Sequence, residues 1–393
     1  MPNLLFHRGT RWKGHVRGST NILASLFLRH GYSVTWLNRP AHFGHAWRDW
    51  WRGDSPPSWY TKVQRYPDGV LEVSPFTLLP IFKFSFLGEF LWAHSSRLGY
   101  RTIYPSLRSV LADSDQPEPD LIWSTGGDGR ALKDAFPQAK RIVQCVDVYE
   151  AYAGPAQKKL EIEDYENADA VVAIGYSLAS YLMRERNVPR DKLFVIGQGA
   201  DLGAFAVPKA EPQDIRAAPH PRLVWLGLLA KADPVLIRSA LESLPSAEGS
   251  LILIGPEADW ARDLAAKDSR VFLLGSRPAE DAVSYLQHCD IGLMLYDQAR
   301  NPKQYLGQNP LKLYEMAAAG LPTISTPHRE YDFTPNPALI VNSVDDLAKA
   351  VPKALSEKYD LSKRMLEFAN RNSWEDRFLD ANSLVRRVLS GSL

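Results

Sequence analysis

A lysine and a glutamate stand three residues apart in the second half of this 393-residue chain, at Lys312 and Glu315. At this spacing the two side chains share one face of a helix, one turn apart. The predicted helix covers 310–319, Gly320 ends it, and Pro322 prevents it from resuming. A cation and free N–H groups at a helix start suit phosphate, and a carboxylate accepts hydrogen bonds from ribose hydroxyls. The pair therefore suits a nucleotide-sugar, and its alternative is an ordinary surface ion pair.

Short apolar strands alternate with helices around this pair. The expected strands are 222–227, 250–255, 270–275, 290–296 and 322–326, and the helices between them are 234–244, 259–266, 279–288 and 310–319. This alternation predicts a parallel sheet covered on both faces. The first three strands end in glycine, at the edge where ligands bind in such sheets. The lysine and glutamate would therefore lie near a ligand-binding edge.

The first half shows the same alternation less regularly. Its expected strands are 4–7, 33–37, 121–124, 141–146, 171–174 and 193–196, and its helices are 19–30 (capped by Ser19 or Thr20), 130–135, 155–168 and 178–186. Residues 40–110 read as irregular, and a polar connection near 206–220 separates the halves. We therefore expect an α/β protein of two facing Rossmann-like domains.

The expected domain boundaries follow from this order. Residues 1–205 form the first domain and 206–372 the second, and helices are expected at 361–371 and 374–389. Residues 373–393 are expected to return across the interface towards the first domain; the alternative is a cap on the second domain. At this length two domains are also the prior expectation.

Composition describes a globular protein, with 45% hydrophobic and 23% charged residues. Cys145 and Cys289 provide neither a disulfide framework nor metal-ligand spacing, which favours a reducing compartment. We expect no signal peptide, because the chain enters its first strand directly, and no span of the bilayer, because no run of 18 apolar residues occurs. No metal site or cofactor is indicated.

Basic and aromatic residues are concentrated near the start of the chain. Residues 1–110 hold 14 Lys/Arg against 5 Asp/Glu, although the net charge of the whole chain is +1. The aromatic residues of this part are Trp36, Trp47, Trp50, Trp51, Trp59, Phe76, Phe82, Phe84, Phe86, Phe90 and Trp92. This combination suits an anionic membrane surface. The alternatives are single-stranded nucleic acid, which we do not expect as a partner, and an aromatic core under a basic surface.

Four segments, taken in order, resemble GT-B glycosyltransferases of the broad family-four type. They are I-G-Q-G-A-D at 196–201, L-V-W-L-G at 223–227, the segments 271–275 and 285–296, and E-M-A-A-A-G-L-P at 315–322. Together they cover most of residues 190–330, whereas the first half is similar only in pattern. The resemblance implies a GT-B fold with the donor on the second domain and the acceptor on the first.

Three departures from that family's pattern point to a different relative. Gly307 stands where a second glutamate is usual, Leu228 follows Gly227 where a basic residue is usual, and Val146 precedes Asp147 where a histidine is common. Lys312 is instead similar to the matching lysine of the xanthan glucuronosyltransferase (GumK-like) family. That resemblance implies an inverting enzyme that uses UDP-glucuronate and builds on a polyprenyl-diphosphate-linked sugar at the membrane.

Inverting transfer needs a general base for the acceptor hydroxyl and positive charge or dipoles for the departing diphosphate. The base is expected at a strand end of the first domain, and the resemblance favours Asp147. Asp128 and Glu150 are the competing carboxylates, and a helix N-cap is the structural alternative for Asp147. The expected donor-binding residues are Lys312, Glu315, Tyr296, Ser276, Arg277, Asn309, Leu311 and Gln308.

Two loops complete the expected site. The glycine-rich basic loop 9–18 is expected to contact acceptor or phosphate through Lys13, Arg17 and Gly18. The polar loop 297–308, which includes Gln304, is expected to contact the sugar, although a solvated loop would look the same.

The predicted function is metal-independent transfer of a sugar from a nucleotide-diphosphate donor, in particular a UDP-sugar, with Asp147 as base. The acceptor is a hydroxyl of a glycan or of a polyprenyl-diphosphate-linked acceptor. The expected location is cytoplasmic, peripheral on the inner face of the cell membrane. The alternatives are a retaining family-four glycosyltransferase and a non-catalytic nucleotide-sugar-binding protein of the same fold.

Overall fold

The computed structural model describes residues 1–393 except 8–10, 14–17, 45–59, 80–96, 127–128, 154–155, 246–247 and 301, and it leaves the side chains of 153 and 156 undescribed. Contacts divide the chain into two compact units. The first unit contains residues 1–197 and 378–393, and the second contains 198–377. The sequence analysis expected the boundaries after 205 and after 372.

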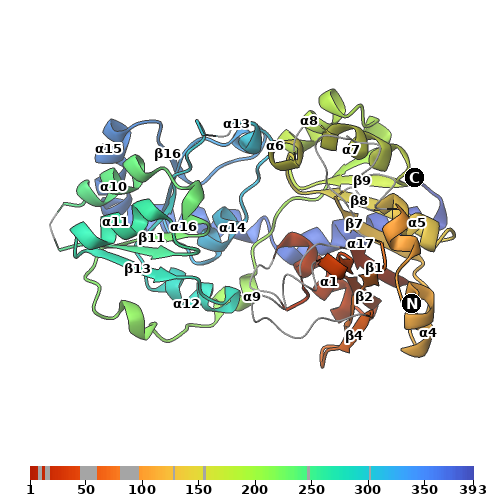
Figure 1. The fold of residues 1–393 in the computed structure, drawn as a ribbon. Coiled ribbons are helices and arrows are strands. Elements are labelled where there is room, and N and C mark those ends of the chain that lie inside the picture. Colours follow the sequence, from red (N-terminus) through yellow and green to blue (C-terminus); the bar gives the residue numbers. More distant parts are fainter. Residues whose placement is uncertain are drawn as a thin grey trace. The chain divides into compact units, whose positions relative to one another are not determined.

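The first unit contains an eight-stranded sheet in the order β10-β9-β8-β7-β1-β2-β5-β4 (Figure 1). Its strands are β1 (Asn3–His7), β2 (Ser33–Leu37), β4 (Lys62–Arg65), β5 (Leu71–Ser74), β7 (Leu121–Thr125), β8 (Lys140–Cys145), β9 (Ala170–Ala173) and β10 (Leu193–Val195). All neighbours are parallel except β4, which pairs antiparallel with β5. A separate parallel pair joins β3 (Ala41–His42) to β6 (Phe76–Thr77).

Helices cover this sheet and stacked aromatic rings fill its core. The helices are α1 (Ser19–Arg29), α4 (Leu107–Asp113), α5 (Gly129–Ala135), α6 (Glu150–Ala153), α7 (Ala156–Glu166) and α8 (Tyr176–Glu185). The buried ring of Phe6 stacks between Trp36 and Trp123, at centroid distances of 6.4 and 5.8 Å. The end of α17 (Trp374–Ser390) belongs to the same core, because Phe378 lies 5.1 Å from the Phe27 ring.

The second unit contains a six-stranded, entirely parallel sheet in the order β13-β12-β11-β14-β15-β16. Its strands are β11 (Arg222–Leu226), β12 (Ser250–Ile254), β13 (Val271–Gly275), β14 (Ile291–Met294), β15 (Thr323–Ser325) and β16 (Leu339–Ile340). This is the strand order of dinucleotide-binding folds, in which ligands bind beyond the carboxyl ends of the strands where the order reverses. In this unit that point lies between β11 and β14.

Two groups of helices bury the faces of the second sheet (Figure 1). One face carries α10 (Pro234–Glu242), α11 (Asp259–Lys267) and α15 (Val344–Ser356). The other carries α12 (Ala282–Gln287), α14 (Leu311–Ala318) and α16 (Lys358–Asn370). Further short elements are α9 (Leu202–Ala206), α13 (Pro302–Tyr305) and the 3₁₀ turns η1 (Arg190–Lys192), η2 (Gln213–Ile215), η3 (Leu229–Lys231), η4 (Ala279–Asp281) and η5 (Arg329–Asp332).

Glycines at two strand ends let the backbone turn closely at the ligand edge. Gly255 has φ +146°, and a Cβ atom there would lie 1.8 Å from the carbonyl oxygen of Gly227. No other residue type fits this approach, which explains why these expected strands end in glycine.

The structure corrects two local predictions. The N-cap of α1 is Gly18, not Ser19 or Thr20, because both side chains are buried and the Thr20 hydroxyl donates to Gln144 Oε1 at 3.0 Å. Residues 40–110 are less irregular than expected, since β4 and β5 form an antiparallel extension of the main sheet.

Within the described residues, no helix combines the length and apolar character that a membrane crossing requires.

Candidate functional site

The loops that follow β11 and β14 join at the switch point of the second sheet. Ala232 and Tyr296 form an isolated antiparallel bridge, and the Asp297 N–H donates to the Lys231 carbonyl at 3.0 Å. Lys231 therefore lies beside the segment after Tyr296. The sequence analysis did not select it, because it stands out of register with the basic residue expected after Gly227.

Lys312 and Glu315 project from the first turns of α14, the helix that connects β14 to β15. Their side chains pair directly, with Lys312 Nζ 2.7 Å from Glu315 Oε2, and remain 29% and 25% exposed. Pro310 occupies the N-cap and its side chain cannot accept a hydrogen bond. The first-turn N–H groups therefore have no capping side chain, and the positive end of the helix dipole lies next to the lysine.

Tyr296 belongs to an aromatic cluster and also feels the charge of Glu315 in the ion pair. Its ring centroid lies 5.1 Å from that of Trp225, 5.9 Å from that of Tyr305 and 5.3 Å from that of His328. Burial raises the pKa of Tyr296 well above its usual value, with further contributions from Tyr305 and the charge of Glu315. The tyrosine thus contributes to packing and also lies within electrostatic reach of Glu315.

Several buried polar atoms near this cluster have no hydrogen-bond partner among the described residues. They are Nδ1 and Nε2 of His328, Nε2 of Gln304 and Oε1 of Gln308. His328 and Gln304 are only 4% and 7% exposed. Burial lowers the pKa of His328 to about 4, so this imidazole is neutral near pH 7. The sequence analysis did not select His328, because a single histidine after Pro327 carries no motif.

The remaining expected donor residues also lie in the second unit. Asn309 is buried, and its Oδ1 accepts from the Tyr314 hydroxyl at 3.0 Å. Leu311 opens α14 and is half-buried. Ser276 and Arg277 follow β13 directly, and the Arg277 guanidinium pairs with Asp214 at 2.8 Å. The Arg277 side chain therefore has a structural role in this structure.

Asp147 lies two residues beyond the carboxyl end of β8 in the first unit and is half-buried. Its Oδ2 accepts from the Tyr152 hydroxyl at 2.7 Å, and its Oδ1 accepts from the Val148 N–H at 2.9 Å. These two bonds orient the carboxylate. The N-terminus of α6 begins further on, at Glu150.

The two competing carboxylates differ from Asp147. Glu150 pairs with Arg186 at 2.9 Å, and Arg186 also binds Glu161 at 2.5 Å. The Arg186 side chain is fully buried, so Glu150 belongs to a buried ion-pair network. Asp128 lies outside the described residues.

The glycine-rich loop of the first unit is described only in part. Lys13 Nζ lies 5.2 Å from the ring centroid of Tyr66, and the Gly18 N–H donates to Asn21 Oδ1 at 3.3 Å. Arg17 lies outside the described residues.

The basic, aromatic part is also described only in part. Trp36 and Phe76 are buried and belong to the core. The aromatics outside the described residues are Trp47, Trp50, Trp51, Trp59, Phe82, Phe84, Phe86, Phe90 and Trp92.

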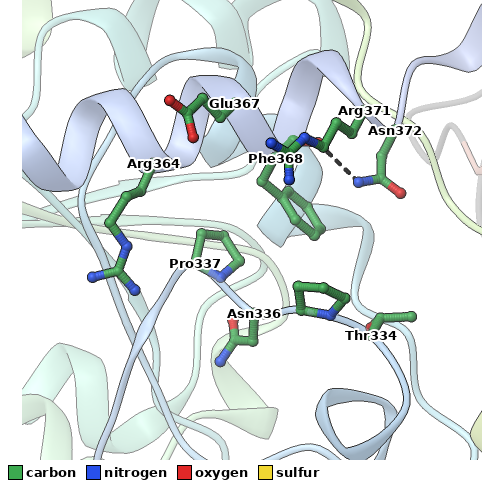
Figure 2. A pocket seen from close by; sticks show the side chains of 9 residues that line it. Thr334, Asn336, Pro337, Arg364, Glu367, Phe368, Arg371 and Asn372 are labelled. Carbon is green, nitrogen blue, oxygen red and sulfur yellow. Dashed lines mark hydrogen bonds between the residues drawn. The ribbon is translucent and has the colours of Figure 1, made fainter.

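A separate pocket of about 460 Å³ lies between α16 and the loop that leads to β16 (Figure 2). Arg364 and Arg371 border it, and Phe368 lies between them. The Phe368 ring packs 5.2 Å from Tyr314 of α14. This pocket contains none of the residues expected to bind the donor, and both of its arginines are exposed.

Sequence comparison finds a family that matches part of the second unit, and a longer alignment to a curated relative. Residues 220–357 match the family described as Glycosyl transferases group 1. TuaH of Bacillus subtilis (strain 168), named as a teichuronic acid biosynthesis glycosyltransferase, is 22% identical over 239 residues. That match covers 56% of this chain and 59% of TuaH.

Solved structures share the fold over nearly the whole chain. Sucrose-phosphate synthase from Thermosynechococcus elongatus superposes with a TM-score of 0.69 at 17% identity, covering 100% of both chains. HepE from Anabaena in complex with UDP-glucose gives a TM-score of 0.64 at 14% identity, covering 98% of this chain and 100% of HepE. This protein therefore has the α/β fold of GT-B glycosyltransferases, and its residues 220–357 carry the sequence pattern of the glycosyl transferases group 1 family.

Proposed function

We propose that this chain transfers a sugar from a UDP-sugar to a hydroxyl of a glycan or lipid-linked acceptor, without a metal ion and with inversion at the anomeric carbon. The observation that carries the proposal is the Lys312–Glu315 pair at the start of α14, within electrostatic reach of Tyr296. This edge of a parallel sheet is where ligands bind in the fold. HepE, which shares the fold, was solved with UDP-glucose.

Lys312 has the chemistry to hold the diphosphate. Its ammonium group and the first-turn N–H groups of α14 form a positive site, as at other helix N-termini that bind phosphate. When the bond between the anomeric carbon and the diphosphate breaks, these groups stabilise the departing charge. Lys231, on the adjoining loop, is a further cation for the same diphosphate.

Glu315 has the chemistry to hold the ribose. An ionised carboxylate accepts hydrogen bonds from both hydroxyls of a ribose. In this role Lys312 would exchange its contact with Glu315 for one with phosphate. The backbone at Ser276 and Arg277, immediately after β13, is the expected contact for the base.

Asp147 is the proposed general base. The acceptor hydroxyl attacks the anomeric carbon and gives its proton to the Asp147 carboxylate, while UDP leaves with the electrons of the broken bond. The Tyr152 hydroxyl and the Val148 N–H hold this carboxylate in one orientation. Glu150 is less suitable because Arg186 already binds it.

The first unit is the proposed contact with an anionic membrane, where a polyprenyl-diphosphate-linked acceptor would be presented. The excess of 14 Lys/Arg over 5 Asp/Glu in residues 1–110 supports this. Phe43, Leu78 and Leu79 are exposed beside the undescribed aromatic segments, which adds apolar surface to the basic part. A cytoplasmic, peripheral location follows from this proposal.

UDP release during incubation with a panel of UDP-sugars and a lipid-linked acceptor tests the function. We expect UDP and glycosylated acceptor to form in equal amounts, and we expect EDTA to leave the rate unchanged. NMR of the product then reports the anomeric configuration, which should be inverted. Binding of UDP-sugars without turnover on any acceptor, or a retained configuration, would contradict the proposal.

A further inference from the structure

We infer that His328, Gln304 and Gln308 form the subsite for the sugar of the donor, and that this sugar is an uncharged hexosyl group. The inference rests on the proposed function, because it requires the donor to bind beside Lys312 and Glu315. It adds a chemical class for the sugar, and it adds His328 to the polar loop that the sequence analysis expected to contact the sugar.

The position of His328 is fixed by the loop after β15. The Thr326 hydroxyl accepts from the Tyr296 N–H at 3.2 Å and lies 3.2 Å from the carbonyl of Met294, which ties this loop to the end of β14. Two residues later, the His328 ring packs 5.3 Å from Tyr296 and 5.2 Å from Tyr331. The imidazole therefore lies at the carboxyl edge of the sheet. Its neighbour there is Tyr296, the residue whose pKa the charge of Glu315 helps to raise.

The buried polar atoms of this subsite lack hydrogen-bond partners within the part of the chain that the structure describes. Neither ring nitrogen of His328 has a hydrogen-bond partner among the described residues, although the residue is only 4% exposed. Gln304 Nε2 on α13 and Gln308 Oε1 on the segment after α13 are also buried and have no hydrogen-bond partner among the described residues. Buried polar groups are almost always paired in folded proteins, so several unpaired groups near one edge indicate that a ligand supplies the partners.

The chemistry of these groups selects hydroxyls over a carboxylate. A neutral imidazole offers one donor and one acceptor, the Gln304 amide nitrogen offers donors, and Gln308 Oε1 is an acceptor. A sugar hydroxyl both donates and accepts, so vicinal hydroxyls can pair with all three side chains. These three side chains carry no charge, so a uronate carboxylate buried among them would find no cation to pair with, whereas hydroxyls need none. The structure therefore favours a neutral hexosyl group over a uronate, contrary to what the xanthan glucuronosyltransferase resemblance implies.

Calorimetric titration of the full chain with UDP, UDP-glucose and UDP-glucuronate tests this inference. The wild-type protein should bind UDP-glucose more tightly than UDP-glucuronate. In His328→Ala the Kd for UDP-glucose should rise about 10-fold, which corresponds to loss of one buried hydrogen-bonding group, while the Kd for UDP stays the same. His328→Gln keeps a neutral donor and acceptor, and we expect it to retain part of the affinity for UDP-glucose.

His288→Ala is the matched control. His288 caps the end of α12 just before β14 begins, so it lies at the amino edge of the sheet, opposite to the edge that carries His328. It should leave the affinity for all three ligands unchanged. A wild-type preference for UDP-glucuronate overturns the inference whether or not the variants fold. Equal losses for UDP and UDP-glucose in His328→Ala also overturn it, since they would indicate a structural role. Failure of the wild-type protein to bind UDP would instead refute the proposed function, and the inference with it.

Discussion

Replacing Lys312 with alanine should reduce catalysis strongly and stability only slightly. The stability cost is small because the Lys312–Glu315 pair is 29% and 25% exposed, and pairs of this kind contribute about 0–1 kcal/mol. The catalytic cost is larger because the lysine is proposed to stabilise charge that develops on the diphosphate. Loss of one preorganised electrostatic group costs about 2–4 kcal/mol of transition-state stabilisation, or about 30- to 900-fold in kcat.

The assay measures UDP release at saturating donor together with thermal unfolding of the same preparations. Lys353→Ala is the matched control, since Lys353 of α15 also pairs with a nearby glutamate, the C-cap residue Glu357, at 3.9 Å. Both variants should unfold within about 2–4 °C of the wild-type protein. Only Lys312→Ala should lose activity.

Three results would refute this reasoning. Unchanged kcat in Lys312→Ala would show that the lysine does not act on the leaving group. A loss of activity matched by a large loss of stability would show that the pair is structural, and a similar loss in Lys353→Ala would show that the assay responds to any change of surface charge.

Three further predictions follow from the described contacts. Asp147→Asn should retain UDP binding and lose transfer about 10²- to 10⁴-fold, measured by product formation; if Glu150→Gln is the inactive variant and Asp147→Asn is active, the base is misassigned. Burial lowers the pKa of His328 from 6.5 to about 4, so between these two pH values the unfolded chain binds more protons than the folded chain. The free energy of unfolding should therefore rise with pH through this window and fall again as the pH is lowered. Urea unfolding of wild type and His328→Gln should show this difference, about 3 kcal/mol at its limit, and parallel pH profiles would contradict it. Liposome co-sedimentation should require anionic lipid and weaken at high salt, with about 1 kcal/mol for each basic side chain near the surface; no binding to any liposome would favour a soluble acceptor.

Most strands and helices of the second unit were predictable because their signals are local, although β16 and α15 were not expected. The strand expected at 250–255 is β12 (Ser250–Ile254), and the helix expected at 310–319 is α14 (Leu311–Ala318). The spacing of Lys312 and Glu315 also predicted their contact, since residues three apart share a helix face. These features depend only on neighbouring residues.

Other features depend on contacts distant in sequence and left no local pattern. All four residues of β4 are exposed, so the strand has no buried apolar face and depends on its pairing with β5. Ser19 and Thr20 resemble helix caps, but tertiary burial directs them inward. His328 gains its unusual environment only when the loop after β15 packs on Tyr296, which sequence spacing does not report.

A crystal structure of the protein with UDP would show where the donor binds. We predict the diphosphate at the start of α14 in contact with Lys312, the ribose on Glu315 and the base against the backbone at Ser276. The pocket bordered by Arg364 and Arg371 lies in the same unit (Figure 2). UDP bound in that pocket and not beside Lys312 would contradict this assignment of the donor site.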